Sequence, residues 1–567
     1  MAVVEPMTVA ESVATSALGL PDSGLQRRIS WTGAFWIASG VPALVLFSIG
    51  SIGAKVGGPS WIVWIVSILF GFVQAFSYAE IAGLFPHKSG GTSVYGAIAW
   101  VRYSKLFAPL SVWCNWLAWS PVLALGTSLA AGNILHTLFP PDAAINTWHI
   151  TLAHLDVIRP GLSLRIDAVF LIGAAILLLA FAIQHRGIGG TARMQIVLGL
   201  IALLPLLVIG VAPLLTGGVH LSNLTELHPL AFDGAGRVLP GRWNMGGVTL
   251  IAGGLFIAAW STYGFETAVC YTREFKDPKR DTVRAILYSG LLCIFVFSVV
   301  PLSFEGALGV GHLLTPAVTD AKGATITPAS YSGILAPDIN SGMGVGEAMA
   351  GMLHVGAVAE KIIVALLILA MLLAVITSMA GSSRTLYQAS IDGWLPRYLS
   401  RTNENGAPVN AMWTDLCFNL LILLLSDSVF VLAISNVCYI LFNFLNLNAA
   451  WIHRRDRPNW ERPFKAPTAL IIAGAVLSFV NLALLGMGAD TWGSGTLIAG
   501  LAVAAGIVPV FLFRHYVTDK GVFPASMTED MHLVPEKGVT NASGWLPFLT
   551  VALGVVVVVV ARMAARY

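Results

Sequence analysis

The sequence predicts an all-α integral membrane protein. Of its 567 residues, 56% are hydrophobic and 11% are Asp, Glu, Lys or Arg, whereas an ordinary soluble domain carries about 25% charged residues. The mean hydropathy is +0.78. This small number of charged residues cannot cover a surface in contact with water. Most side chains must therefore face lipid or other helices. The lipid bilayer is therefore the first expected partner.

Thirteen segments are candidates for crossing a bilayer, which takes about 20 mostly apolar residues in a helix. They cover residues 32–54, 60–82, 108–135, 166–184, 195–215, 247–271, 283–304, 356–380, 410–426, 429–452, 468–488, 496–514 and 545–562. The first twelve predict transmembrane helices, and the last predicts a thirteenth, C-terminal helix. If that helix spans, Arg562 and Arg566 lie outside, so a helix lying on the membrane surface is the alternative.

The distribution of Lys and Arg residues orients the chain. With the N-terminus placed inside, the inner connecting segments hold most of these residues, including the basic groups at residues 273–284 and 454–465. Cytoplasmic loops of membrane proteins carry such an excess. The sequence therefore predicts a multi-pass protein of the cytoplasmic membrane with a cytoplasmic N-terminus.

Several classes of function are disfavoured by what the sequence lacks. Residues 1–26 lack the regions of a signal peptide and predict a disordered cytoplasmic tail. A net charge of +3 without a basic tract argues against nucleic acid as a partner. The five cysteines form no CxxC or Cys/His cluster, so no metal or cofactor is expected. No HExxH, GxSxG or P-loop motif indicates an enzyme. Nothing indicates an oligomeric state.

Two of the predicted helices contain residues that interrupt a helix near its middle. The first holds Gly40 and Pro42, and the sixth holds the run from Ser261 to Gly264. Proline removes a donor, and glycine costs about 1 kcal/mol in a helix interior. Irregular backbone at this depth is tolerated where it lines a cavity or is buried in protein.

The two interrupted helices are five apart and run in opposite directions. That arrangement is typical of transporters built from inverted repeats, in which the interrupted helices form the substrate site. The alternative is that these residues only kink the helices or let them pack closely.

Four stretches of the chain resemble a known family. SYAEIAGLFPHKSGGTSVYGA follows the second helix, and TARMQIVLGLIALLPL forms the fifth. TYGFE followed by EFKDPKRDTVRAI begins in the sixth helix, and SSRTLYQASIDGWLPRYLSRTNENGAPVNA follows the eighth. In residue types, order and spacing, these stretches are similar to those of the amino acid–polyamine–organocation (APC) superfamily of permeases, across residues 27–467.

The resemblance implies a LeuT-type fold of five plus five helices. It places the first repeat at residues 27–215 and the second at 216–452. Peripheral helices eleven and twelve then occupy 453–516, and a cytoplasmic segment with the C-terminal helix occupies 517–567. The implied activity is secondary active transport of an amino acid or a related small organic amine by alternating access.

The resemblance also implies that the substrate lies between the interrupted helices one and six, facing helices three and eight. Free carbonyls of an unwound turn accept an ammonium group, and the N-terminus of a half-helix binds an anionic group. The predicted substrate-binding residues are Ser39, Gly40, Val41, Pro42, Ala43, Phe47, Trp119, Trp260, Ser261, Thr262, Tyr263 and Gly264. Trp116 is a further candidate beside Trp119.

The first helix departs from the family pattern. The closely spaced glycines of the family fall on residues 44–48, which read LVLFS here, and Gly40 and Pro42 come earlier. Either the break is shifted by a turn or the site is more apolar than usual. An inorganic cation such as K⁺ is the alternative substrate.

The coupling ion is expected to be H⁺ or Na⁺. Some proton-coupled relatives carry a lysine in helix five, in the place of a sodium ion, where this sequence has Ala202. The hydroxyls of Thr377 and Ser378 are a possible sodium site, although such pairs also serve helix packing. Glu266 lies deep in the membrane, where an unpaired carboxylate costs about 2.5–3.5 kcal/mol, so it either pairs inside the bundle or carries a proton.

A charged loop follows helix six. Glu274, Lys276 and Arg280 belong to it, and they are expected either to be solvated or to pair with Glu80 or with the loop after helix eight. Such a pairing would latch the cytoplasmic side of the protein.

Overall fold

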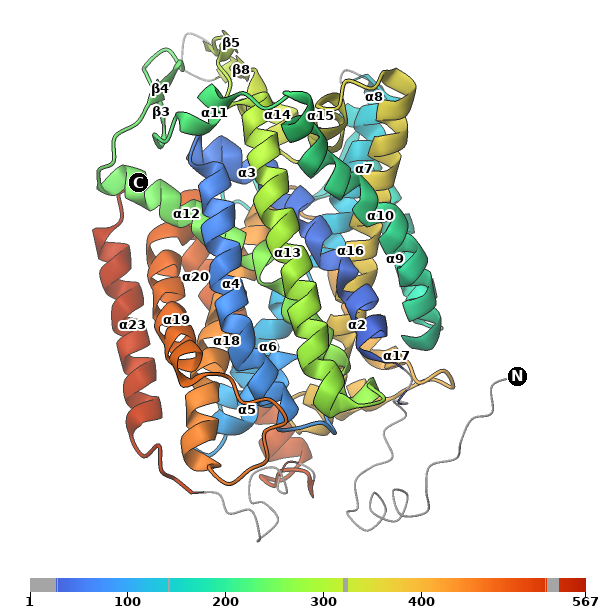
Figure 1. Cartoon of the computed structure of the whole chain (residues 1–567), viewed down its shortest axis with the longest axis vertical. Coiled ribbons are helices and arrows are strands. Elements are labelled where there is room, and N and C mark those ends of the chain that lie inside the picture. Colours follow the sequence, from blue (N-terminus) through green and yellow to red (C-terminus); the bar gives the residue numbers. More distant parts are fainter. Residues whose placement is uncertain are drawn as a thin grey trace.

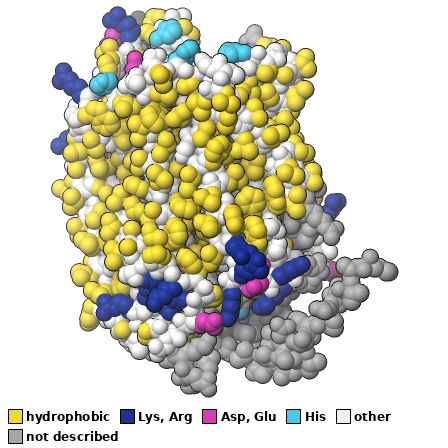
Figure 2. Space-filling view, viewed as in Figure 1, with side chains coloured by type: hydrophobic (Ala, Val, Ile, Leu, Met, Phe, Trp, Pro, Cys, Tyr) yellow, Lys and Arg dark blue, Asp and Glu magenta, His cyan; other side chains and the backbone are white. Residues whose placement is uncertain are grey.

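The computed structural model describes residues 27, 29–140, 143–186, 188–319, 325–525, 527 and 540–566. The chain is mostly helical, and the long helices run side by side along the long axis of the molecule (Figure 1). On the face shown in Figure 2, hydrophobic side chains cover the middle, and most Lys and Arg side chains lie toward the two ends. This distribution is typical of a protein whose middle faces lipid.

The first half of the chain contributes α2 to α11. Their bounds are α2 Trp31–Ile37, η1 Ala38–Leu44, α3 Val45–Val56, α4 Ser60–Gly83, α5 Thr92–Trp100, α6 Phe107–Trp119, α7 Val122–Leu138, α8 Ala144–Thr147, α9 Ala168–Gln184, α10 Ile188–Thr216 and α11 Leu221–Thr225. The elements α2, η1 and α3 follow one another without a gap and form the first predicted span, whereas α6 and α7 divide the third.

The second half contributes α12 to α23. Their bounds are α12 Met245–Thr262, η2 Gly264–Glu274, α13 Pro278–Leu308, η3 Gly333–Leu335, α14 Pro337–Asn340, α15 Val345–Gly351, α16 Ala357–Ile391, η4 Arg397–Ser400, α17 Val409–Leu423, α18 Ser428–Asp456, α19 Thr468–Gly488, η5 Ala489–Trp492, α20 Thr496–Ala505, α21 Ile507–Leu512, η6 Phe513–Thr518 and α23 Leu546–Ala564. The elements η1 to η5 are 3₁₀-helices and η6 is a π-helix.

All thirteen predicted segments are helical. Within the described residues, eleven helices are long and apolar enough to cross a membrane. The apolar helices α9 and α17 are shorter, with 17 and 15 residues, and they occupy the predicted spans 166–184 and 410–426. The chain is thus a multi-pass membrane protein, and the totals of twelve or thirteen spans stay predictions.

Short antiparallel hairpins correct the all-α expectation. β1 (His149–His154) pairs with β2 (Ser163–Asp167), and β3 (Leu230–Phe232) pairs with β4 (Val238–Pro240). β5 (Leu313–Thr315) pairs with β8 (Ser330–Tyr331), and β6 (Val318–Thr319) pairs with β7 (Thr325–Thr327). β3, β4, β5 and β8 lie at one end of the bundle near α8, α11, α14 and α15, which we call the hairpin end (Figure 1). The opposite end, with α5 and the start of α2, is the α5 end.

The C-terminal helix α23 lies alongside α19 and parallel to the bundle (Figure 1). Arg562, near its last turn, forms an ion pair with Asp490 of η5, with 2.6 Å between Nη2 and Oδ2. The Asp490 carboxylate offsets the charge of Arg562, one of the two arginines that a spanning α23 would place on the outer side. The orientation of α23 favours a spanning helix over one lying on the membrane surface.

The two predicted repeats and the predicted peripheral part do not form separate bundles of helices. Helix α13 packs along α4, and α18 packs on α6 and α19, so helices from all three predicted parts share one bundle. The boundaries at residues 215 and 452 stay predictions. Residues 1–26, the predicted tail, lie outside the described residues.

Candidate functional site

The two predicted helix breaks lie against each other inside the bundle. Gly264 is the first residue of η2, and a Cβ atom there would lie 2.6 Å from Trp119 of α6 and 3.2 Å from Val41 of η1. Contacts that short would force close-packed neighbours to move. Glycine at this position therefore lets η2 pack directly on η1 and α6.

The first break also packs closely on α16. A Cβ atom on Gly40 would lie 2.5 Å from Thr377 Oγ1 and 2.6 Å from the carbonyl oxygen of Leu373. Pro42 lies inside η1 and has no N–H to donate. The Thr377 hydroxyl donates to the carbonyl oxygen of Ile37 at 2.6 Å, where α2 ends. The interruption predicted at Gly40 and Pro42 is confirmed, and α16 donates a hydrogen bond to its backbone.

The remaining residues of the first break are enclosed in the core. Ser39 is buried, and its hydroxyl donates to the carbonyl oxygen of Trp36 at 2.5 Å. Ala43 is fully buried. A Cβ atom on Gly199 of α10 would lie 2.8 Å from Ser39 Oγ, so α10 closes this side of the break.

The second break begins later than predicted. Ser261 and Thr262 still belong to α12, and both hydroxyls donate to the carbonyl oxygen of Ala258 one turn earlier. Hydroxyl side chains that bond back in this way are compatible with a continuous helix. The helix changes type at Tyr263, and the following segment is a 3₁₀-helix. The expectation of an unwound turn is therefore wrong for Ser261 and Thr262, and the geometry changes at Tyr263 and Gly264.

Hydroxyl groups from neighbouring helices meet this end of α12. Ser67 of α4 lies 2.9 Å from Thr262, and Ser48 of α3 lies 3.4 Å from Ser261, both measured between side-chain oxygens. These four side chains are buried and uncharged. They supply hydrogen-bonding groups beside the break without adding a charge.

Five aromatic side chains, Phe47, Trp119, Trp260, Tyr263 and Tyr439, lie around the meeting point of the breaks and are called the aromatic cluster. The ring of Trp260 lies 6.1 Å from those of both Phe47 and Trp119. Tyr439 of α18 lies 5.6 Å from Trp119 and 5.9 Å from Tyr263. The structure thus brings four predicted residues together and adds Tyr439, which sequence reasoning missed.

Glu266 is buried in η2 beside this cluster. Its Oε1 atom accepts a hydrogen bond from the Tyr439 hydroxyl at 3.0 Å. Its Oε2 atom is buried and has no partner within the described residues. Of the two roles considered for Glu266, pairing inside the bundle is the one for which the structure provides a partner.

A third break, not predicted, divides the span at residues 108–135. Helix α6 ends at Trp119 and α7 begins at Val122, because Pro121 cannot donate its backbone N–H. Two polar residues of α17 bind this break. Asp415 accepts from the Ser120 hydroxyl at 2.5 Å, and Asn419 accepts from the Ala124 N–H at 3.2 Å. A proline and a carboxylate inside apolar segments were the available signals.

The possible sodium-binding hydroxyls both contact backbone carbonyls at breaks. Thr377 contacts Ile37 as stated above, and Ser378 donates to the carbonyl oxygen of Trp119 at 2.6 Å. Carbonyl and hydroxyl oxygens are the ligands that hard cations prefer. The side chain of Ala202, at the lysine position of proton-coupled relatives, lies outside the described residues.

Two buried ion pairs close the α5 end. Arg384 of α16 binds Glu274 of η2, with 2.5 Å between Nε and Oε1, and both side chains are at most 2% exposed. Lys88 binds Asp392 with 2.6 Å between Nζ and Oδ1, again with at most 2% exposure. Arg384 was expected in a loop, but α16 continues to Ile391 and carries it into the core. Glu274 therefore pairs with helix α16 itself.

Glu80 has other partners than the charged loop. Its carboxylate binds Arg454 at 2.6 Å and Arg462 at 3.1 Å, and it accepts from the N–H of Ala466 at 2.8 Å. Burial lowers the pKa of the Arg462 guanidinium, and the adjacent Glu80 opposes this shift. The expected pairing of the loop with Glu80 is therefore wrong, because α18 and the segment after it enclose this carboxylate.

The other loop charges are exposed. Lys276 and Arg280 face solvent, and Lys279 forms an ion pair with Glu461 at 2.8 Å in which both side chains are more than half exposed. The backbone of Lys276 does have a role, because its N–H donates to the carbonyl oxygen of Ile29 at 2.8 Å. For these side chains, the structure agrees with the solvated alternative.

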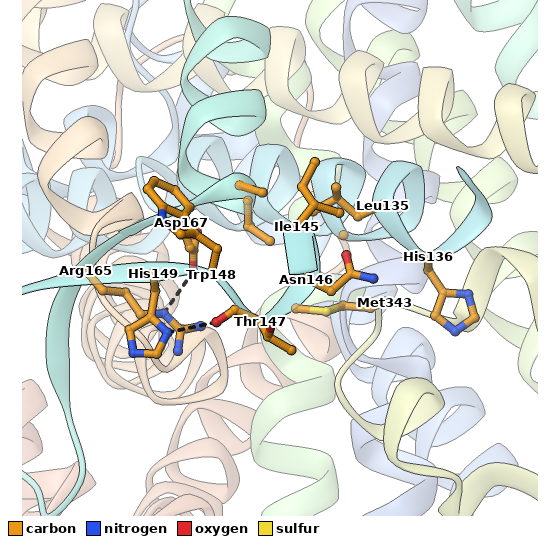
Figure 3. A pocket seen from close by; sticks show the side chains of 13 residues that line it. Leu135, His136, Ile145, Asn146, Thr147, Trp148, His149, Arg165, Asp167 and Met343 are labelled. Atoms are coloured by element: carbon orange, nitrogen blue, oxygen red, sulfur yellow. Dashed lines mark hydrogen bonds and ion pairs between the residues drawn. The ribbon is translucent and has the colours of Figure 1, made fainter. Parts of the chain in front are cut away.

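A pocket of about 250 Å³ opens at the hairpin end (Figure 3). It lies between the end of α7, α8, the hairpin β1–β2 and Met343, and Arg165 and Asp167 line one side as an ion pair. Gly126 of α7 packs on Phe47 of the aromatic cluster, and Gly132, six residues further along α7, lines the pocket. At 1.5 Å per residue, the pocket is about 9 Å from that contact along α7.

Comparison with known proteins identifies the family. The family model described as "Amino acid permease" matches residues 29–508. The branched-chain amino acid permease BcaP of Lactococcus lactis subsp. cremoris (strain MG1363) is 23% identical over 496 residues, which cover 84% of this chain and 93% of the relative. The protein of the same name from Bacillus subtilis (strain 168) is 23% identical over 461 residues, covering 79% and 86%.

These relatives are transporters and not enzymes, and the match includes every helix that forms the breaks and the aromatic cluster. The chain therefore belongs to the amino acid permease family.

Proposed function

We propose that the protein is a secondary active transporter that carries an apolar amino acid across the cytoplasmic membrane by alternating access. The observation that carries this proposal is the contact of η1 and η2 beside the aromatic cluster. The 3₁₀-helices η1 and η2 pack closely through Gly40 and Gly264. A substrate that binds between them would move the two helices apart. The backbone groups released there would bind the ammonium and carboxylate groups of the substrate.

The neutral lining favours an apolar substrate side chain. The aromatic cluster and the hydroxyls of Ser48, Ser67, Ser261 and Thr262 carry no formal charge. Glu266, a carboxylate beside the cluster, already accepts a hydrogen bond from Tyr439. An aromatic, uncharged surface stabilises an aliphatic or aromatic side chain and would leave a charged one without a partner. The names of the two relatives agree with a branched aliphatic side chain.

The remaining parts of the proposal concern direction and coupling. The excess of Lys and Arg at the α5 end supports a cytoplasmic location for that end and for the N-terminus. H⁺ or Na⁺ is the proposed coupling ion, and the oxygens of Thr377, Ser378, Ile37 and Trp119 are the candidate sodium ligands. An inorganic cation as the transported substrate is not favoured by the family or by the relatives.

Ligand binding tests the substrate class. The purified protein is heated with leucine, isoleucine, valine, phenylalanine, lysine, glutamate, putrescine, K⁺ or Na⁺, because a ligand that binds the native state raises the apparent melting temperature. We expect stabilisation by the apolar amino acids. Stabilisation by inorganic cations alone would contradict the proposal.

Exchange of radiolabelled leucine in proteoliposomes then tests transport. Uptake against an unlabelled internal pool should exceed that of protein-free vesicles. Thr377→Val should remove any dependence on Na⁺ if the two hydroxyls bind sodium, and Thr491→Val, which also removes a hydroxyl bonded to a helix carbonyl, serves as the control. An unchanged Na⁺ dependence in Thr377→Val would contradict the sodium site.

A further inference from the structure

Asp415 is a carboxylate buried inside the bundle and surrounded by neutral donors. It lies on α17, and its side chain is fully buried. Oδ1 accepts from the Trp116 indole N–H at 2.9 Å and from the Ser120 hydroxyl at 2.5 Å. Oδ2 accepts from the Ser382 hydroxyl of α16. Asp415 thus connects α17 to α6 and α16 at the level of the third break.

The surroundings of Asp415 differ from those of several other buried carboxylates. Within the described residues, no Lys, Arg or His forms an ion pair with Asp415, whereas Glu80, Glu274 and Asp392 each have one. The titratable groups on α17 and on the helices packed against it are Cys114 (α6), His136 (α7), Glu360, Lys361, Arg384 and Tyr387 (α16), Arg397 and Tyr398 (η4) and Cys417 (α17), while α9 has none. Of these, Arg384 is the nearest in sequence to Ser382, and it binds Glu274.

The two oxygens of the carboxylate have different surroundings. The Trp116 indole can only donate, and Ser120 accepts from the Asn419 amide at 2.7 Å, so its own proton is available to Oδ1. Oδ1 is thereby confined to accepting. Among the described residues, the hydrogen-bond partner of Oδ2 is the Ser382 hydroxyl, which can either donate or accept.

If Oδ2 is protonated, the hydrogen-bonding groups of Asp415 and Ser382 therefore still have partners. When Asp415 is ionised, Ser382 donates to Oδ2. When Asp415 is protonated, the new O–H can donate to Ser382, whose own proton can turn to the carbonyl oxygen of Met379, 3.5 Å from Ser382 Oγ. Both states satisfy the hydrogen bonds of the site, and the protonated state removes an unpaired charge that costs about 2.5–3.5 kcal/mol at membrane depth.

The site is connected to the aromatic cluster. Ser120 directly follows Trp119, whose ring contacts Trp260 and would contact any side chain at Gly264. Ser382 lies one turn after Ser378, which donates to the Trp119 carbonyl. A proton gained or lost at Asp415 thus acts on both helices that position Trp119.

We propose that Asp415 is a proton-binding site that couples proton movement to substrate transport. This inference rests on the proposed function and names the proton as the coupling ion. Asp415 exchanges the proton through Oδ2 and Ser382, and the third break between α6 and α7 transmits the change to the aromatic cluster.

Infrared spectroscopy tests the proton site independently of transport. Difference spectra of the reconstituted protein between acidic and alkaline pH are compared for wild type, Asp415→Asn and Glu305→Gln. Glu305 is the matched control, because it is buried in α13 and accepts from the single hydroxyl of Ser60 at 2.5 Å. We expect Asp415→Asn to remove a C=O band of a protonated carboxyl group that titrates in wild type and that is still present in Glu305→Gln, whatever band of its own that control loses. An unchanged spectrum of Asp415→Asn would overturn the inference.

Transport measurements test the coupling. In proteoliposomes, Asp415→Asn should retain leucine exchange but reduce uptake driven by a proton gradient, and the accompanying proton movement, to the level of protein-free vesicles. Glu305→Gln should resemble wild type. Proton-driven uptake that is unchanged in Asp415→Asn would overturn the inference, as would wild-type uptake that moves Na⁺ and no protons. If wild type exchanges no amino acid, the proposed function fails, and the infrared spectrum still decides the proton site.

Variants of Ser382 provide the test if Asp415→Asn does not fold or loses exchange as well. Ser382→Ala removes a donor to the carboxylate, so the protonated form should persist to higher pH and the midpoint of the pH profile of uptake should rise. Ser382→Thr keeps the hydroxyl and should restore the wild-type midpoint. A midpoint that is the same in all three proteins would overturn the inference.

Discussion

The middle of the protein and its α5 end are held together by different forces. Around the aromatic cluster, contacts are made by rings, hydroxyls and closely packed glycines. At the α5 end, η2, α16 and the segment after α4 are joined by the ion pairs Glu274–Arg384 and Lys88–Asp392. A neutral, packed boundary separates at little electrostatic cost, whereas breaking a buried ion pair exposes two charges. The middle is therefore suited to admit a substrate, and the α5 end is suited to close one side of the path.

The largest effect is expected from removing one charge of a buried pair. Arg384→Met should lower the free energy of unfolding by about 3–5 kcal/mol, because it leaves Glu274 buried without a partner. The double variant Glu274→Gln/Arg384→Met should recover most of this loss. Denaturant titration of the detergent-solubilised protein measures both. If the single and double variants are equally unstable, the buried pair does not determine stability at the α5 end.

A smaller effect on stability is expected from filling the contact between the breaks. Gly264→Val should cost about 1–3 kcal/mol and abolish leucine uptake, because the new side chain overlaps Trp119 and Val41. Gly234→Val is the control, since that glycine is exposed, has open space around it and lacks a positive φ. Full uptake by Gly264→Val would remove η2 from the substrate site.

Replacing the central tryptophan should mainly alter affinity. Trp260→Phe removes hydrogen bonds from the indole N–H to the Ala118 carbonyl and to Ser435, at 2.9 and 3.2 Å. A loss of about 1 kcal/mol would raise the Kd for leucine about fivefold. Trp243→Phe removes a comparable bond to the Leu227 carbonyl at the exposed hairpin end and should leave the Kd unchanged. Equal effects of both variants would show that Trp260 is not part of the binding surface.

The smallest effect is expected at an exposed ion pair of the same α5 end. Lys279→Ala removes the pairing with Glu461, whose side chains are 58% and 67% exposed, and should change the free energy of unfolding by less than about 1 kcal/mol. Lys279→Ala and Arg384→Met each remove the cation of an ion pair, one exposed and one buried. The difference between their effects on the free energy of unfolding therefore measures the contribution of burial. A destabilisation by Lys279→Ala as large as that of Arg384→Met would show that burial does not distinguish the two pairs.

Sequence reasoning located the helices and the first break because the responsible signals are local. Apolar runs specify the spans, and Gly40 and Pro42 disfavour a regular helix wherever they occur in one. The predicted start of the second break at Ser261 is wrong, because Ser261 and Thr262 do not interrupt the helix. Their hydroxyls instead bond back to Ala258, which is compatible with the helix.

The end of α16 shows a limit of reading polarity as exposure. Its run from Ser382 to Ser390 is polar and was predicted as a loop, but these side chains are buried and make hydrogen bonds or ion pairs with Asp415, Gly90 and Glu274. Burial of polar groups depends on partners far away in the chain. Asp415 was missed for the same reason, although a carboxylate in an apolar segment was a visible signal.

The sequence by itself determined that the chain is a multi-pass, helical membrane protein, and it located two of the helices that are interrupted. These properties depend on residues that are close together along the chain. Only the tertiary structure decided that Tyr439 joins the aromatic cluster, that Glu274 binds Arg384, and that Asp415 binds the third break. Each of these contacts joins residues more than a hundred positions apart, and their energy depends on distance and burial that no local pattern specifies.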